Sequence, residues 1–226
     1  MTKPFASSAD TAEKTDTLEV LADGVYALTA EGDPNVGAVE GEDFVVAIES
    51  RATPAASREW LKILREKTDK PIRTLILTHY HAVRVLGASA FGAQDIIMSD
   101  ASKTLVAERG EADWKSEFGR MPRLARNAEE VPGLTWPTIT FATDYRIELG
   151  GDRGALELKF LGRGHTGGDI VVWLAPNDDQ DWTGHSALML DGERIIHATG
   201  GKGVVIETLA EVEARLVAEG FATARS

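Results

Sequence analysis

The stretch Thr74-Leu75-Ile76-Leu77-Thr78-His79-Tyr80-His81 decides the fold class of this 226-residue chain. Residues 74–78 form a short, continuous apolar run, which is typical of a strand that is buried on both faces and flanked by helices. His79 and His81 follow the carboxyl end of this strand, where open α/β sheets usually place their ligand sites. The stretch therefore predicts an α/β layered structure with a ligand site at residues 79–81.

Segments on both sides of this strand alternate between strand and helix patterns. Before it, strands are expected at 25–29 and 44–48, followed by a helix at 54–67. After it, the patterns predict a helix from 87, a strand at 95–98, a helix at 100–114 with Asp100 as N-cap, an irregular lobe at 120–137, and strands at 138–141, 145–149, 155–161 and 170–174. These patterns indicate mixed sheets with flanking helices.

Three segments follow from this pattern. Residues 1–17 are polar and are expected to form a flexible tail, and residues 18–175 form the main domain. A polar break at 176–181 is the one plausible internal boundary. Beyond it, residues 176–226 predict short strands around Leu188 and Ile195, a glycine-rich turn at 200–203 and a final helix.

Composition excludes several classes of function. No apolar run approaches the roughly 18 residues that a membrane span needs, and the start of the chain has no apolar core like that of a secretory signal, so a cytoplasmic protein without a membrane partner is expected. A net charge of -12 would repel a nucleic-acid backbone. The chain has no cysteine, so a metal must be held by imidazole or carboxylate.

Three histidines are the candidate metal ligands. His79 and His81 can point into one cavity if their segment is a tight loop, and His165, in the glycine-rich stretch 162–169, can complete the site. Three neutral imidazoles on zinc leave one position for water and lower the pKa of that water to roughly 7. Spacing alone leaves the alternative open, because a histidine after a strand is more often a loop or core residue.

The motifs Thr78-His79-Tyr80-His81 and Gly164-His165-Thr166, with the opening run 24–50, resemble the metallo-β-lactamase family in order and spacing. The resemblance covers residues 18–175 and implies an incomplete αββα sandwich that binds one Zn²⁺. The family pattern is H-x-H-x-D-H, but Val83 and Arg84 replace its aspartate and last histidine, which argues against a second metal. Arg84 is either a surface or salt-bridged arginine or a cation that polarises an anionic substrate or oxyanion.

Three interpretations of His185 remain open. The family's bridging aspartate lies in a Thr-Gly-Asp turn about 20 residues after the third histidine, and here Thr183-Gly184-His185 lies at that distance. Alternatively, residues 181–210 resemble the end of an NlpC-type cell-wall peptidase, in which His185 would be the base and His197, 12 positions later, its orienting residue. Both histidines also fit a plain β-hairpin, and without a cysteine such a peptidase would be inert.

These observations favour a mononuclear metal-dependent hydrolase of an unidentified small molecule, weak or inactive. The alternatives are a non-catalytic metal-binding or scaffold protein derived from such a hydrolase, and a peptidase remnant. The absence of both the bridging carboxylate and the aspartate that Val83 replaces favours the scaffold interpretation, because catalysis in the family usually depends on a carboxylate near the attacking water. The sequence names neither the substrate nor the oligomeric state.

Overall fold

The computed structural model describes residues 11–30, 33–175, 187–189, 194–199, 203–208 and 210–211. The chain divides into two compact units, residues 1–177 and residues 178–226. Residues 11–16 form no helix or strand, although Asp16 pairs with Arg51 at 2.9 Å. Thr17, the last residue of the predicted tail, begins the first strand.

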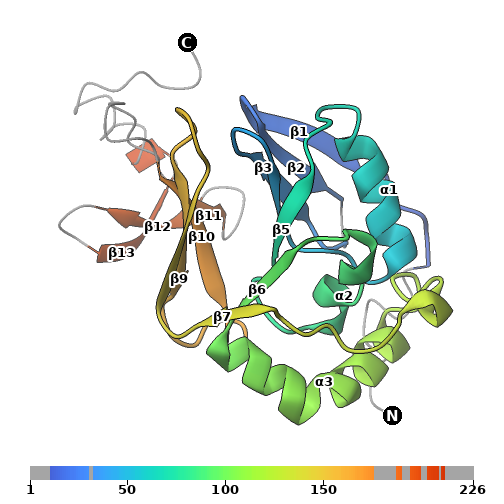
Figure 1. Ribbon diagram of the computed structural model, residues 1–226. Helices are drawn as coiled ribbons and strands as arrows, with labels where there is room; N and C mark the ends of the chain where they lie inside the picture. Colours follow the sequence, from blue (N-terminus) through green and yellow to red (C-terminus); the bar gives the residue numbers. More distant parts are fainter. Residues whose placement is uncertain are drawn as a thin grey trace. The chain divides into compact units, whose positions relative to one another are not determined.

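A seven-stranded mixed sheet forms the centre of the first unit (Figure 1). Its strands follow one another in space in the same order as in the sequence. The first four strands pair antiparallel, and those from β4 to β7 pair parallel. The strands are β1 (Thr17–Ala22), β2 (Val25–Thr29), β3 (Val36–Glu40), β4 (Val45–Ile48), β5 (Ile72–Ile76), β6 (Asp95–Ser99) and β7 (Ile139–Phe141).

Helices connect the parallel strands. They are α1 (Pro54–Leu64), α2 (Ala82–Val85) and α3 (Asp100–Arg120), with single 3₁₀ turns η2 (Ala88–Ala90) and η3 (Ala128–Glu130). Thr53 begins α1 as its N-cap and accepts a hydrogen bond from Ala56 N. No helix in the described ranges is both long and apolar enough to cross a bilayer.

The helix α3 differs from the predicted one at both ends. Ser99, not Asp100, is the N-cap, because Ser99 ends β6 in an extended conformation and its hydroxyl accepts a hydrogen bond from Ser102 N. Asp100 lies in the first turn, where a carboxylate interacts favourably with the helix dipole. The helix also continues beyond Trp114, which stacks edge-on against Phe118 at 6.1 Å.

A second, three-stranded antiparallel sheet packs on the first. It contains β8 (Asp144–Glu148), β9 (Ala155–Phe160) and β10 (Ile170–Ala175), in the order β10-β9-β8. Leu156 and Leu158 of β9 and Ile170 of β10 join one apolar core with Val46 and Ile76 of the larger sheet. Alternate side chains therefore place one face of each sheet against the other.

The opposite face of the larger sheet packs against the helices. Val45 and Leu75 point into this second core, where Trp60 of α1 and Val106 of α3 meet them. Trp60 is completely buried. The described part of the first unit therefore has a helix–sheet–sheet arrangement, and the predicted α/β fold with layered mixed sheets is confirmed.

In the second unit the described residues form an antiparallel meander of β11 (Ala187–Met189), β12 (Arg194–Thr199) and β13 (Gly203–Thr208). The predicted strands around Leu188 and Ile195 are therefore present. Three short antiparallel strands occur in many folds, so the resemblance to an NlpC-type peptidase stays a prediction. The predicted final helix lies almost entirely outside the described residues.

Candidate metal centre

The loop after β5 is fixed at Thr78, its second residue. Thr78 N donates to the Glu49 carboxylate (Oε1) at 2.6 Å, and the Thr78 carbonyl accepts a hydrogen bond from Ile170 N at 2.9 Å. These two contacts join the ends of β4, β5 and β10 around one residue. His79, Tyr80 and His81 follow, and α2 begins at once with Ala82.

Glu49 is an unusual residue at this position. It adopts a left-handed backbone conformation with φ of 64°, which a residue with a side chain rarely does, and it is only 5% exposed. Burial raises the pKa of Glu49 to about 7, while the hydrogen bonds from Thr78 oppose this shift. Such strain at a loop that carries chemical groups is typical of functional sites.

The structure brings His79, His81 and His165 together. One nitrogen from each ring lies within 4.8 Å of the others. The ring centroids are 5.1 Å apart for His79 and His81, 5.5 Å for His79 and His165, and 4.8 Å for His81 and His165. His79 and His81 are half-buried and His165 is exposed, so the triad lies at a surface that a ligand can reach.

The orientation of each ring determines which nitrogen faces the triad. His81 Nδ1 lies 3.1 Å from His165 Nε2, so these two nitrogens point toward each other. His79 Nδ1 contacts the Thr78 hydroxyl at 3.0 Å, which leaves His79 Nε2 for a ligand. Burial, together with the charges of His81 and Arg84, lowers the pKa of His79 to about 4. Burial also lowers the pKa of His81, against the opposing charge of Asp113.

This donor set fits a transition-metal ion. Three nitrogens bound tetrahedrally at about 2.0–2.1 Å from zinc lie roughly 3.3 Å apart. The separation of 3.1 Å between His81 Nδ1 and His165 Nε2 is close to this value, and all three nitrogens lie within 4.8 Å of one another. Neutral imidazoles present the lone pairs that such an ion needs. Three ligands also leave a fourth position open.

The loop that carries His165 is held tightly from both sides. The Asp169 carboxylate accepts hydrogen bonds from Thr166 N at 3.0 Å and from the Thr166 hydroxyl. Burial raises the pKa of Asp169, but these hydrogen bonds outweigh it, so the net pKa is lowered. The Gly168 carbonyl accepts from the hydroxyls of Ser99 at 2.6 Å and Ser102 at 2.9 Å. The start of α3 therefore fixes the position of the third histidine.

Arg84 lies on α2 beside the triad. Its backbone N donates to the His81 carbonyl at 2.9 Å, and its carbonyl accepts from the Ser50 hydroxyl at 2.7 Å. The guanidinium donates to the Asn35 carbonyl at 3.3 Å. No carboxylate among the described residues lies within ion-pair distance of it, whereas Val83, its neighbour, is buried. Arg84 therefore carries a positive charge at the edge of the site.

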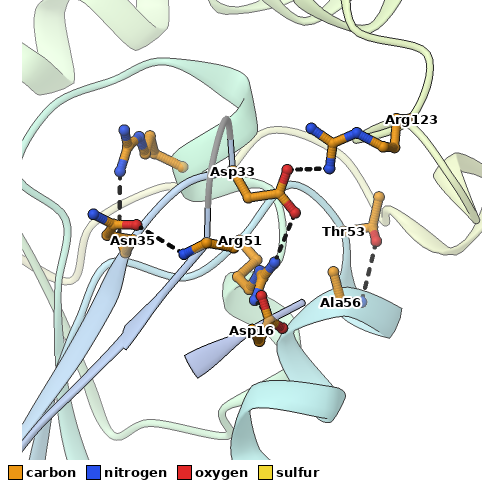
Figure 2. A network of polar contacts seen from close by, with 9 residues as sticks. Asp16, Asp33, Asn35, Arg51, Thr53, Ala56 and Arg123 are labelled. Carbon is orange, nitrogen blue, oxygen red and sulfur yellow. Dashed lines mark hydrogen bonds and ion pairs between the residues drawn. The ribbon is translucent and has the colours of Figure 1, made fainter. Parts of the chain in front are cut away.

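A network of charged residues flanks this region (Figure 2). Figure 2 shows Asp33 between Arg51 and Arg123, with Asp16 on the other side of Arg51. The distance from Arg51 to Asp33 is 3.2 Å, and the side chains of Asp33, Arg51 and Arg123 are at most 10% exposed. A cavity of about 340 Å³ adjoins the network but is lined by none of the three histidines. Because Asp16 and Asp33 together balance the charges of Arg51 and Arg123, we assign the network a structural role.

The side chains of the other two predicted histidines are not among those that the structure describes. His185 lies outside the described residues. His197 is in β12, where its backbone pairs with Ala187 and Val205, and nothing of its side chain is described. Their proposed roles as base and orienting residue stay predictions.

Two carboxylates near the triad were missed by the sequence analysis. Glu49 directly follows the apolar strand β4, and His79 lies three residues after the end of β5. A polar residue just after the carboxyl end of a buried strand was therefore the signal that could have identified Glu49. Asp113 lies in the middle of α3, and its Oδ1 is 3.9 Å from His81 Nε2. Nothing in the local sequence distinguishes Asp113 from the other acidic residues of that helix.

Comparisons with known proteins give structural neighbours only. No protein-family model and no curated protein matches this chain. A metallo-beta-lactamase from Pontibacter korlensis is 23% identical to this chain, with a TM-score of 0.51. The match covers 71% of this chain and 67% of the metallo-beta-lactamase. The stereoselective inverting sec-alkylsulfatase Pisa1 from Pseudomonas sp. is 16% identical with a TM-score of 0.55, covering 70% of this chain. A double mutant of the same sulfatase has a TM-score of 0.56.

This chain spans 29% of the length of the alkylsulfatase. At these identities the likeness establishes the fold and not the activity. The large mixed sheet with its flanking helices agrees with that likeness. The chain therefore has a metallo-β-lactamase fold, with a histidine triad in a position to bind a metal ion.

Proposed function

We propose that this chain is a metal-dependent hydrolase that holds one zinc ion with His79, His81 and His165. The convergence of three imidazole nitrogens within 4.8 Å carries the proposal. When bound, such an ion polarises water and an ester, lactone or amide carbonyl at neutral pH. The proposal is limited to one ion because Val83 and Arg84 stand where the family motif has the ligands of a second one.

The chain's own residues supply the rest of the site. Thr78 orients His79 through its hydroxyl, and Glu49 fixes the backbone of the same loop. Arg84 offers a guanidinium for a negatively charged substrate group or a developing oxyanion. This favours a small anionic substrate, because Arg84 has no carboxylate partner among the described residues.

A non-catalytic metal-binding protein is the second candidate function. It is favoured by one observation: within the described residues, the group able to hold a metal contains three histidines and no carboxylate. Asp113 and Asp169 are engaged with backbone N–H groups of Ala82 and Thr166. Without a carboxylate at the ion, proton transfer in a hydrolysis reaction has no evident acceptor.

The test begins with metal content. The full chain, purified without added zinc, should contain at most one transition-metal ion, and two ions per chain in elemental analysis would contradict a mononuclear site. His81→Ala should lose most of its zinc affinity, because two remaining ligands seldom retain zinc against a chelator. His197→Ala serves as the control and should bind zinc like the parent.

Hydrolysis then separates the two candidates. Zinc-loaded parent protein should hydrolyse an activated ester or lactone, and chelation of the metal should remove the activity. Arg84→Gln should lower the rate on an anionic ester more than on a neutral one. Full zinc binding without any metal-dependent hydrolysis would favour the non-catalytic candidate.

His185 needs its own variant. If His185→Ala raises the rate of hydrolysis, His185 is a fourth ligand that blocks the open position. If activity and zinc affinity do not change, His185 lies away from the ion, which is the result we expect. Loss of activity with zinc retained would make it a general base.

A further inference from the structure

A carboxylate from α3 contacts the metal loop at two adjacent residues. Asp113 Oδ2 accepts a hydrogen bond from Ala82 N at 2.8 Å, at the first residue of α2. Its other oxygen, Oδ1, lies 3.9 Å from His81 Nε2. The Asp113 side chain is 10% exposed and the His81 side chain 21%, so water screens this contact only partly.

The two oxygens of Asp113 face different groups. A separation of 3.9 Å is longer than a hydrogen bond, so the contact between Oδ1 and His81 is electrostatic. A negative oxygen beside one nitrogen of a neutral imidazole favours the proton on that nitrogen. For His81 this is Nε2, and the lone pair is then on Nδ1, the nitrogen that lies 3.1 Å from His165.

We propose that Asp113 is a positioning residue of the metal centre, which holds the His81 loop through Ala82 and directs the lone pair of His81 Nδ1 toward the ion. The inference rests on the proposed metal site at the three histidines. Carboxylates that orient a ligating imidazole through its other nitrogen typically contribute 10–100-fold to metal affinity. Asp113 reaches the loop from a separate helix, 31 residues further along the chain.

The substitution Asp113→Asn tests this role sharply. Ala82 N–H still requires an acceptor, so the amide oxygen takes the place of Oδ2. The amide NH₂ group then faces His81 Nε2, and its positive hydrogens favour the lone pair on Nε2 and the proton on Nδ1, which removes the lone pair from the triad. A residue that only caps α2 would be replaced well by asparagine, whereas a positioning residue would not.

Zinc affinity of the full chain, measured by competition with a chromophoric chelator, is the first readout. Asp113→Asn and Asp113→Ala should both bind zinc 10–100-fold more weakly than the parent. Glu111→Gln removes the same charge from the same helix at an exposed position and is the matched control. Its affinity should stay within about twofold of the parent.

Long-range ¹H–¹⁵N spectra of the metal-free proteins are the second readout. His81 should carry its proton on Nε2 in the parent and on Nδ1 in Asp113→Asn, with His81→Ala assigning the signals. Parent-like zinc affinity and an unchanged tautomer in Asp113→Asn would overturn the inference and leave Asp113 as a helix cap. If the parent binds no zinc, the proposed function fails. In that case the spectra alone test the role of Asp113, and an unchanged His81 tautomer in Asp113→Asn contradicts that role.

Discussion

The contact between Gly168 and the start of α3 leaves no room for a side chain. A Cβ atom at Gly168 would lie 2.4 Å from Ser102 N and 2.5 Å from the Ser102 hydroxyl. Because ordinary contacts begin at 3.4 Å, Gly168→Ala must move the loop away from the helix by about 1 Å. The hydrogen bonds from Ser99 and Ser102 to the Gly168 carbonyl, now 2.6 and 2.9 Å, would then break.

The cost of Gly168→Ala follows from these contacts. Two lost hydrogen bonds contribute about 1 kcal/mol each, and overpacking adds about 1–3 kcal/mol, so the free energy of unfolding should fall by about 3–5 kcal/mol. Metal sites tolerate ligand displacements of only about 0.2 Å. Because His165 lies three residues from Gly168, zinc binding should weaken as well.

Gly167→Ala is the matched control, since a Cβ there meets only Leu105 Cδ1 at 3.6 Å. Its unfolding free energy should stay within about 1 kcal/mol of the parent. Urea unfolding of both variants and of the parent, together with zinc titration, measures the difference. Equal stability and equal zinc affinity for the two alanine variants would refute the packing of the His165 loop against α3.

Three other perturbations have defined outcomes. Asp33→Ala leaves two buried arginines without their shared carboxylate and should cost about 3–5 kcal/mol in urea unfolding, whereas Glu148→Gln, at an exposed ion pair, should cost less than about 1 kcal/mol. Burial raises the pKa of Glu49 from 4.5 to about 7, so the free energy of unfolding of the metal-free protein should fall by about 3 kcal/mol as the pH rises from about 4.5 to about 7. Glu49→Gln should remove this pH dependence. Thr53→Ala removes the N-cap of α1 and should lower the free energy of unfolding by about 1 kcal/mol, whereas Thr53→Ser should keep the parent's value.

Much of the fold could be predicted because it depends on local patterns. The apolar run at 74–78 contains most of β5, and the predicted strands at 145–149, 155–161 and 170–174 correspond to β8, β9 and β10. Each of these strands has its own alternation or apolar run, bounded by turn residues. The histidines of the triad could be found because two of them directly follow such a strand.

The remaining features depend on contacts that a local pattern does not contain. Ser99 could not be distinguished from Asp100 as the cap of α3, because both side chains can accept a hydrogen bond from the helix N-terminus and only the end of β6 decides between them. Asp113 and Glu49 reach the metal loop across 31 and 29 residues of sequence. Their roles follow from the packing of α3 against α2 and of β4 against β5, which a short motif does not contain.

The sequential strand order of the large sheet has a consequence for biosynthesis. Each of its strands pairs only with strands that neighbour it in the chain, so the sheet can grow strand by strand as the polypeptide leaves the ribosome. His79 and His81 are synthesised more than 80 residues before His165, which arrives with the turn between β9 and β10. A nascent chain that ends before this turn holds two ligands, and two seldom retain zinc. Metal capture is therefore expected as a late event, after the large sheet has formed.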